Sequence, residues 1–537
     1  MRTTDSRSED GMREPCDIAL VGCGAVGASF LARLEVDAGG FVGSVVIVDP
    51  AEEPGRGIAY GRDANSNLLN RANAAISVRA DDLGEFFRWF VEERAAGRLE
   101  PQHANVPLEA DGYAPRPLFG DYLVSRVRRT LAALAALGWR VRKERGMVID
   151  IDEESGSYQV TVSNGASFVA RSVVLATGNG PSSAFRRFEG QEGYVALPYP
   201  NEGLSRRIGA DAPVALLGSR LSAVDTAIAL TDQGHRGPVF LASRTGQLPM
   251  VGGGNGNHVL APATLEVARY ARHAGPGSVS LVRLMRLMLR EMARAEGRRL
   301  PVRSITRPEL SPTQAFLACV EEREANVRKP WQDALIPFND YVADFWNALP
   351  DDDRRRLMCG AYGAYMGYRV SIPLENGRKV AGLLRAGRVT NLWPLKEVTH
   401  DGEAFVLRFG TGGPTLAPDL RVPVLVNCTG LVGGPDASAG PLYPSLIAGG
   451  LARRHPFGGI DVDPHTNRVI GAHGSAHRLF AIGNSTQGVF LLTSNLVLNA
   501  AHAARVVDLL LADLASAAAP SSRATNACIN GAQNVAL

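Results

Sequence analysis

The chain has 537 residues, of which 45% are hydrophobic and 21% are charged, and its formal net charge is +3. This length and composition predict a soluble globular protein of two or three domains. The small charge, without a basic stripe of residues interleaved with aromatic ones, argues against nucleic acid as a partner. No apolar run is long enough to span a bilayer. Residues 1–16 are polar and mixed in charge, unlike a signal peptide or a membrane anchor.

The cysteine and histidine residues are scattered along the chain. No two of the six cysteines form a CxxC pair, which suits the reducing cytoplasm and argues against a structural zinc or a redox-active disulfide. The ten histidines include no HExxH or similar ligand spacing. We therefore expect a cytoplasmic protein without a metal site.

A βαβ pattern lies near the N-terminus. Residues 17–21 read as a short apolar strand, and Gly22-Cys-Gly-Ala-Val-Gly27 reads as the turn that follows it. A helix pattern over 28–36 then leads to a second apolar strand, 44–49. The pattern predicts a dinucleotide-binding unit.

The side chains of this turn suit a dinucleotide. Gly22 permits the tight turn, Gly24 lets the backbone approach a pyrophosphate, and Gly27 lets the helix pack closely on the strand. Asp49 ends the second strand, where its carboxylate can accept hydrogen bonds from the hydroxyls of an adenosine ribose. A glycine-rich turn in an unrelated α/β unit is the alternative, and the agreement of strand, helix, strand and acid disfavours it.

A second, degenerate copy of this pattern begins near residue 212. A buried strand is expected over 214–218, a helix over 221–230 and a further strand over 238–242. The turn between strand and helix is Gly218-Ser-Arg-Leu-Ser-Ala223. Two such units predict either two nucleotides or one nucleotide and a vestigial site.

Two further segments resemble each other. Residues 148–178 and 403–430 each alternate like a β-meander and end in an apolar strand that stops at Thr-Gly. The first copy ends at Thr177-Gly178. Small residues at such a stop let the backbone lie against a bound cofactor, although an ordinary strand end gives the same pattern.

The remaining segments complete the expected domain organisation. Residues 262–375 have a mainly helical pattern, so we expect an insertion that provides a lid or a pocket wall. The Ala/Ser/Asn-rich tail after Ser516 is expected to be disordered. The expected parts are a first dinucleotide-binding domain (16–185 and 420–515), a second dinucleotide-binding domain (186–261 and 376–419), the helical insertion (262–375) and the tail (516–537).

Several short motifs, taken in their order along the chain, resemble those of the FAD/NAD(P)-binding family of flavoproteins with two dinucleotide domains. The resemblance covers most of residues 16–510. The chain is also similar, more distantly, to flavin monooxygenases of the N-hydroxylating and Baeyer–Villiger kinds. Its motifs are Gly22–Gly27, Gly55-Arg-Gly-Ile-Ala-Tyr-Gly61, Asn67-Leu-Leu-Asn70, Arg116-Pro-Leu-Phe-Gly-Asp-Tyr-Leu123, Ala176-Thr-Gly178, Ser243-Arg-Thr-Gly-Gln-Leu-Pro249 and Ala481-Ile-Gly-Asn484.

The resemblance implies that FAD occupies the first fold. Asn70 would lie near the flavin ring, and Gly483-Asn484 stands where relatives often carry Gly-Asp, so that contact would lack a charge. A helix beginning near Thr486 would offer its N-terminal amides to the flavin. A simple turn asparagine is the alternative for Asn484. The residues expected to bind cofactor in this half of the protein are Gly22, Gly24, Ala25, Val26, Gly27, Asp49, Pro50, Asn70, Thr177, Gly178, Gly483, Asn484 and Thr486.

The second site departs from the family pattern. Arg220 stands where relatives have the glycine that touches the nicotinamide cofactor's pyrophosphate, so it either clamps the phosphates or blocks them. Ser243 and Arg244 suit a 2′-phosphate, which favours NADPH over NADH. A fold that has become purely structural is the alternative. The residues expected to bind the second cofactor are Gly218, Ser219, Arg220, Leu221, Ser222, Ser243 and Arg244.

The resemblance implies an FAD-dependent, NADPH-using monooxygenase. NADPH would reduce the flavin, oxygen would add at the flavin C4a carbon, and the hydroperoxide would oxygenate a small molecule, with an amine nitrogen as the first substrate type to test. No side chain then needs to act as nucleophile, and no catalytic residue is assigned. The Baeyer–Villiger fingerprint is incomplete, because Tyr194 replaces its histidine, and no GxSxG supports acyl transfer.

Two other functions remain open. One is a flavin dehydrogenase, oxidase or reductase that transfers no oxygen. The other is a protein that binds FAD as a sensor or interaction module, and Arg220 and Asn484 keep this alternative open.

Overall fold

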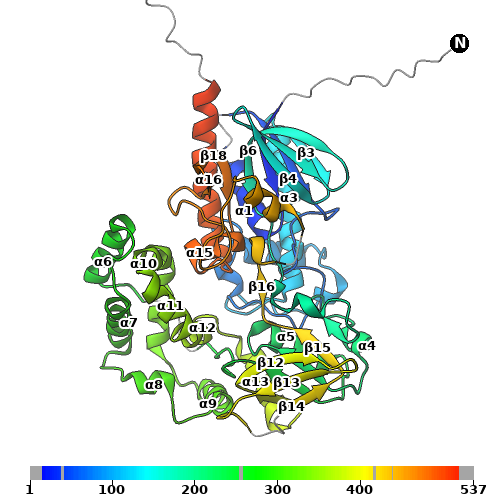
Figure 1. The fold of residues 1–537 in the computed structure, drawn as a ribbon, viewed down its shortest axis with the longest axis vertical. Helices are drawn as coiled ribbons and strands as arrows, with labels where there is room; N and C mark the ends of the chain where they lie inside the picture. Colours follow the sequence, from blue (N-terminus) through cyan, green and yellow to red (C-terminus); the bar gives the residue numbers. More distant parts are fainter. Residues whose placement is uncertain (1–14, 38–40, 253–257, 415–418, 438–439, 519–537) are drawn as a thin grey trace, which may run out of the picture.

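The computed structural model describes residues 15–37, 41–252, 258–414, 419–437 and 440–518. Two parallel-stranded units lie one above the other in Figure 1, and a group of helices lies beside the lower one. The expected fold class, two Rossmann-like units with a mostly helical insertion, is confirmed. The tail expected to be disordered lies outside the described residues from 519 onward, and its first three residues belong to the last helix.

The first sheet has the strand order β17-β18-β6-β1-β2-β3. Its strands are β1 (Cys16–Val21), β2 (Ser44–Asp49), β3 (Arg140–Arg145), β6 (Ser167–Leu175), β17 (Arg468–Gly471) and β18 (Gly474–Ala481), with a hairpin of β4 (Val148–Glu154) and β5 (Ser157–Val162) beside β6. Along β1, Ile18 and Leu20 pack into one core and Ala19 and Val21 into another. Burial on both faces explains why the strand is a continuous apolar run without alternation.

Helices from both ends of the chain cover this sheet. The helix α1 (Ala25–Asp37) packs against α3 (Arg116–Ala136) and against the C-terminal helix α16 (Leu496–Ala518). It begins inside the glycine turn, three residues earlier than expected, because the amide of Ala28 already donates to the carbonyl of Gly24. Smaller helices of this unit are α2 (Glu85–Ala95), α14 (Leu442–Ala448) and α15 (Gln487–Phe490).

The second sheet has the order β11-β10-β9-β15-β8. Its strands are β8 (Tyr194–Val195), β9 (Val214–Leu217), β10 (Val239–Ala242), β11 (Val389–Leu392) and β15 (Val424–Asn427). The helices of this unit are α4 (Leu204–Ile208), α5 (Leu221–Asp232) and α13 (Leu374–Arg385). A separate antiparallel sheet precedes β15 and consists of β12 (Leu395–His400), β13 (Phe405–Phe409) and β14 (Asp419–Val422).

One expected domain boundary is wrong. The assignment of 420–515 to the first domain placed Val424–Asn427 in the first sheet. In the structure this strand pairs in parallel with β9, from Val424 opposite Val214 to Asn427 opposite Leu217. Each meander therefore feeds its own sheet, through β6 in one unit and β15 in the other, which is why the two segments resemble each other.

The insertion lies between β10 and β11, which are neighbours in the second sheet. Its helices are α6 (Pro262–Ala274), α7 (Leu281–Glu296), α8 (Val302–Thr306), α9 (Pro312–Glu324), α10 (Val342–Ala348), α11 (Asp351–Cys359) and α12 (Tyr362–Arg369), with the short 3-10 helices η5 (Pro330–Leu335) and η6 (Pro337–Tyr341) between α9 and α10. Leu284, Leu287 and Met292 bury one face of α7, and its arginines stay on the solvent side. None of the helices in the described part of the chain combines the length and apolar character that crossing a membrane requires.

A buried ion pair joins the two units. The Nη1 atom of Arg116, on α3, lies 3.0 Å from Oδ2 of Asp225, on α5, and Tyr199 donates a hydrogen bond to the same oxygen. Burial raises the pKa of Asp225 although the charge of Arg116 opposes the rise, and the same pair raises the pKa of Arg116. The pair therefore helps to fix the orientation of one unit against the other.

The insertion also meets the first unit along a polar cavity of about 310 Å³. Arg272 and Asp344 line it from the insertion, paired at 2.9 Å, and His502 and Arg505 line it from α16. His502 is 9% exposed, and the centroid of its ring lies 4.2 Å from that of Phe490. Burial, followed by the charge of Arg505, lowers the pKa of His502 to about 3.

This histidine is expected to make the protein less stable in acid. The unfolded chain has the ordinary histidine pKa of about 6.5, so below that pH it binds a proton that the folded protein does not. The free energy of unfolding should fall by about 2 kcal/mol between pH 7 and pH 5 through this one group. His502→Phe keeps a ring against Phe490 and should remove that part of the pH dependence in denaturant unfolding. The exposed His473→Phe should leave it in place, and an unchanged slope in His502→Phe would contradict the assignment.

Candidate functional site

The first dinucleotide turn is closed by Gly22. Its φ is +87°, its amide donates to the carbonyl of Val48 at 2.8 Å, and a Cβ at this position would overlap the carbonyl oxygen of Ala176. The turn therefore lies directly against the strand end that leads to Thr177-Gly178. At the far end of the turn, a Cβ on Gly27 would lie 2.6 Å from the carbonyl oxygen of Gly22. Only glycine fits at both positions.

Three segments far apart in sequence meet at this turn. A Cβ on Gly24 would lie 3.4 Å from Cα of Gly57, so the loop after β2 crosses the turn. A Cβ on Gly483 would lie 3.4 Å from the side chain of Val26. The position of Gly178 has open space in the direction of a Cβ. The structure thus brings together the glycine turn, the Thr177-Gly178 stop and the Gly483-Asn484 turn, and the sequence analysis gave Gly57 no role.

Asp49 has a role that the sequence analysis missed. Its Oδ2 accepts a hydrogen bond from the amide of Cys23 at 2.7 Å, and its Oδ1 accepts one from the amide of Ala51 at 2.8 Å. Asp49 therefore holds the glycine turn and the chain beyond the exposed Pro50 in place. Each carboxylate oxygen keeps a further lone pair, so a ribose hydroxyl can still donate to it.

The C-terminal part of this site differs from the expected helix end. Asn484–Thr486 is a 3-10 turn, and the helix α15 that follows has four residues. Such a short helix carries little dipole. The amides of Gln487 and Gly488 at its start donate to the carbonyls of Asn484 and Gly458. Asn484 is buried and accepts a hydrogen bond from Ser494 at 3.3 Å, while Thr486 donates to the carbonyl of Gly483. The exposed Asn70 lies on the loop after Asn67, which is buried and donates to Asp63.

The second turn repeats the geometry of the first. Gly218 has a φ of +113°, its amide donates to the carbonyl of Ala242 at 2.7 Å, and a Cβ would lie 2.7 Å from the carbonyl oxygen of Cys428. The amide of Val224 donates to the carbonyl of Arg220 as that of Ala28 does to Gly24. Arg220 therefore occupies the position of Gly24, and Leu221 and Ser222 open the helix α5.

The side chain of Arg220 points to the insertion. Its Nη2 donates to the carbonyl of Gly363, on α12, at 2.5 Å, and burial lowers its pKa. In the described part of the chain it has no acidic partner. Arg220 thus ties the insertion to the second turn, a contact for which its sequence gave no signal because Gly363 lies 143 residues away.

The residues after β10 differ from those after β2. Ser243 follows Ala242 in the position that Asp49 has after Val48, because Ala242 pairs with Leu217 as Val48 does with Val21. The Oγ of Ser243 lies 3.0 Å from Oγ of Ser219 and accepts a hydrogen bond from the amide of Gly246. Arg244 is exposed and forms no hydrogen bond or ion pair with any residue that the structure describes. In the second unit, a serine therefore stands where the first unit has the carboxylate of Asp49, and an exposed arginine follows it.

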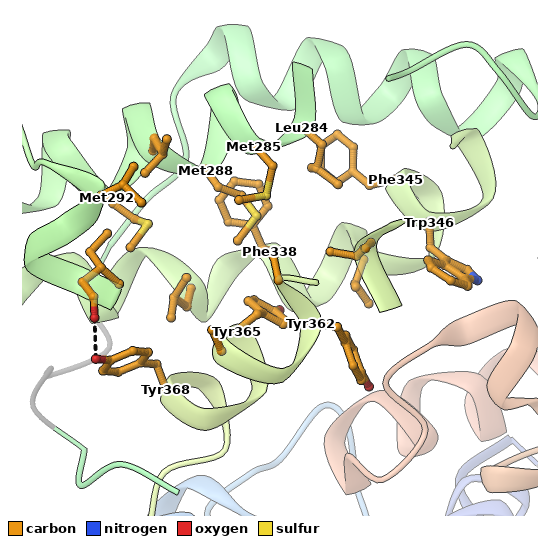
Figure 2. Close-up of a pocket in the computed structure, with 18 of the residues that line it drawn as sticks. Leu284, Met285, Met288, Met292, Phe338, Phe345, Trp346, Tyr362, Tyr365 and Tyr368 are labelled. Carbon is orange, nitrogen blue, oxygen red and sulfur yellow. Dashed lines mark hydrogen bonds between the residues drawn. The ribbon is translucent and has the colours of Figure 1, made fainter. Parts of the chain in front are cut away.

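An apolar cavity of about 170 Å³ lies in the insertion (Figure 2). Side chains of α7, among them Met285 and Met288, face Tyr362 and Tyr365 of α12 across it. Leu491, the residue after α15, contributes to its wall. The cavity therefore adjoins the C-terminal segment of the first unit and the helix that Arg220 holds.

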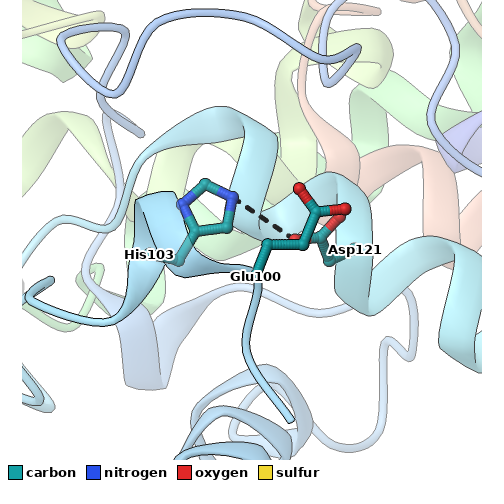
Figure 3. Close-up of side chains that lie close together, drawn as sticks. All are labelled: Glu100, His103 and Asp121. Atoms are coloured by element: carbon teal, nitrogen blue, oxygen red, sulfur yellow. Dashed lines mark ion pairs between the residues drawn. The ribbon is translucent and has the colours of Figure 1, made fainter.

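The group of Glu100, His103 and Asp121 is close enough to share a cation (Figure 3). Arg56 already pairs with Asp121 at 2.6 Å, and Arg62 pairs with Glu100 at 3.2 Å. Two arginines therefore neutralise both carboxylates, and the group is an ion-pair network with a buried histidine.

Known proteins share parts of this architecture. Residues 19–180 match the family model described as FAD-NAD(P)-binding. No curated protein shows a significant sequence match. Among solved structures, ornithine hydroxylase from Pseudomonas aeruginosa is 14% identical with a TM-score of 0.51, covering 93% of this chain and 100% of that one. The FAD-bound cadaverine monooxygenase of desferrioxamine biosynthesis from Erwinia amylovora is 12% identical with a TM-score of 0.51, covering 93% and 95%.

Bacillithiol disulfide reductase from Staphylococcus aureus, at 11% identity and a TM-score of 0.48, covers 93% of this chain and 99% of its own. At these identities, similarity shows the fold and not the reaction. Residues 19–180 therefore resemble an FAD-NAD(P)-binding family, and the chain has the fold of flavoproteins that carry two dinucleotide-binding domains.

Proposed function

We propose that the protein is an FAD-dependent, NADPH-using monooxygenase that oxygenates a small molecule. The observation that carries the proposal is the matched geometry of the two turns at Gly22 and Gly218, with an apolar cavity beside segments of both units. A monooxygenase of this kind needs two nucleotide sites and a pocket from which water is excluded. The two solved structures with TM-scores of 0.51 are named as a hydroxylase and a monooxygenase, which supports the same choice.

The residues present fit FAD at the first turn. The Gly24 position presents backbone without a side chain, and Gly178 faces open space. The Asp49 carboxylate, held by two backbone amides, would accept hydrogen bonds from the ribose. When bound, FAD accepts a hydride from NADPH and, once reduced, activates molecular oxygen.

At the second turn, Ser243 and Arg244 would bind the 2′-phosphate of NADPH, and Gly218, Ser219, Leu221 and Ser222 would present backbone to the pyrophosphate. Arg220 keeps the insertion against this turn. Trp346 donates from Nε1 to the carbonyl of Gly488 at 2.6 Å, which closes the insertion against the first unit. Together these contacts would shield the reacting atoms from water.

The test begins with the absorption spectrum of the purified protein. We expect bound flavin, bleaching by NADPH without oxygen, and an oxygenated product when oxygen and a substrate are then admitted. Hydrogen peroxide without product for any candidate substrate would instead indicate an oxidase or reductase. Failure of NADPH and NADH to reduce bound flavin would indicate a sensor or interaction protein.

Arg244→Ala should weaken the binding of NADPH but not that of NADH. Loss of a charge-assisted hydrogen bond of about 1.5–3 kcal/mol corresponds to about a tenfold to hundredfold higher NADPH concentration for half-maximal reduction. NADH has no 2′-phosphate, so its concentration dependence should change little. Arg236→Ala, at another exposed arginine of the same unit, is the control. Equal effects of Arg244→Ala on both cofactors would remove the proposed role.

A further inference from the structure

We infer that the apolar cavity of the insertion binds an uncharged, apolar group of the substrate, about as large as an aromatic ring or a short alkyl chain. This inference rests on the proposed function, because it gives that enzyme its substrate class. It departs from the amine first considered from the sequence, which carries a positive charge at neutral pH.

The lining of the cavity offers nothing to a charged group. Among the described residues that line it, none is charged, and aliphatic, thioether and aromatic groups make up most of its surface. The Tyr368 hydroxyl already donates to the carbonyl of Ile305 at 2.7 Å. An ammonium or carboxylate placed here would lose its hydration without gaining a partner of opposite charge.

The cations at the edge of the cavity also oppose a positively charged ligand. Arg369 lies on α12, on which Tyr362 and Tyr365 line the cavity, and its Nε donates to the amide oxygen of Asn339 and not to a carboxylate. Arg220 donates to the carbonyl of Gly363 on the same helix. Two guanidinium groups with neutral partners therefore stand beside the tyrosines, so a diamine would meet repulsion there.

The size of the cavity limits its occupant. Its volume of about 170 Å³ is close to that of an engineered apolar protein cavity of about 150 Å³ that stays dry and binds benzene. Met285, Met288 and Met292 line one side, opposite the tyrosines of α12 (Figure 2). Methionine side chains are flexible and make favourable sulfur contacts with rings, so this wall can adapt to a flat or a linear apolar group.

The position of the cavity suits a substrate. Leu491 closes one part of it and directly follows α15, the short helix after Asn484–Thr486. Tyr362 closes another part and adjoins Gly363, which Arg220 binds. The cavity thus touches the segments expected near both cofactors, where the group that receives oxygen must lie.

The test is calorimetric titration of the FAD-loaded full-length protein with indole, an uncharged aromatic probe, and in parallel with cadaverine. We expect indole to bind and cadaverine not to compete. Met288→Trp fills the cavity and should weaken indole binding by at least about tenfold. Arg286→Trp places the same ring on the solvent face of α7 and should leave binding unchanged.

A second cavity variant tests the inference in case Met288→Trp does not fold. Ala364→Leu narrows the cavity from α12 and should also weaken indole binding while flavin content is retained. Indole that fails to bind the wild-type protein, binds both cavity variants as before, or is displaced by cadaverine overturns the inference. Anaerobic flavin reduction by NADPH is measured separately on each variant. Normal reduction without indole binding defeats the cavity assignment alone, whereas indole binding without any oxygenated product defeats the proposed function alone.

Discussion

Gly24→Val is expected to give folded protein that has lost nearly all its FAD. A Cβ at Gly24 already comes within 3.4 Å of Gly57, and the two methyl groups of valine would extend into the space between the glycine turn and the loop over it. In a dinucleotide turn that space belongs to the pyrophosphate. The measurement is the flavin absorbance per polypeptide after purification, with circular dichroism to confirm the fold.

The control for this experiment is Gly382→Val. Gly382 lies on the exposed side of α13 and a Cβ there has no heavy atom within 4 Å. That variant should keep its yellow colour and normal stability. If Gly24→Val is folded and fully yellow, FAD does not bind at the first turn.

Asp225→Ala should destabilise the protein by about 3–5 kcal/mol, because it leaves the largely buried guanidinium of Arg116 between the units without its anion. The free energy of unfolding, measured with urea, reports this loss. Replacing both partners with apolar residues, Arg116→Met with Asp225→Leu, should recover much of the stability, since the unpaired charge is then gone.

A surface pair provides the comparison. Asp211 and Arg236 are paired within the same unit but lie in water, with side chains 67% and 66% exposed, so Asp211→Ala should leave stability within error. A similar small effect of Asp225→Ala would show that water reaches the interface and that the two units are not held by this pair.

Local patterns were enough to predict the two glycine turns. The residues that make each turn lie within about ten positions of one another. The strands on both sides are buried on both faces, so their continuous apolar sequences clearly predict strands. The position of β15 was misjudged for the opposite reason. Its partner β9 lies some two hundred residues earlier, and an apolar strand fits either sheet equally well until its neighbours are known.

Contacts within the candidate site were harder to predict. The carboxylate of Asp49 was assigned to a ribose, yet it also holds the amide of Cys23, because a carboxylate at a strand end can reach the turn of the neighbouring strand. The docking of Arg220 on Gly363 depends on where the insertion folds back, and no spacing in the sequence encodes that. The cavity combines residues from α7 and α12 with Leu491. Helical periodicity predicts only that one face of each helix is buried, and not that these faces enclose a cavity.

The path of the chain between the units has a consequence for its synthesis. The chain leaves the first unit at β7 (Gly180–Pro181) and returns at β16 (Leu431–Val432), and these two short strands pair antiparallel. All five strands of the second sheet, from Tyr194 to Asn427, emerge from the ribosome without interruption. The first sheet must wait for β18 and α16. The second unit is thus complete while the first still exposes the edge of β6 that β18 will cover and the side of α1 that α16 will cover. The nascent protein therefore depends on a short delay before β18 and α16 are synthesised, or on a chaperone that covers this surface.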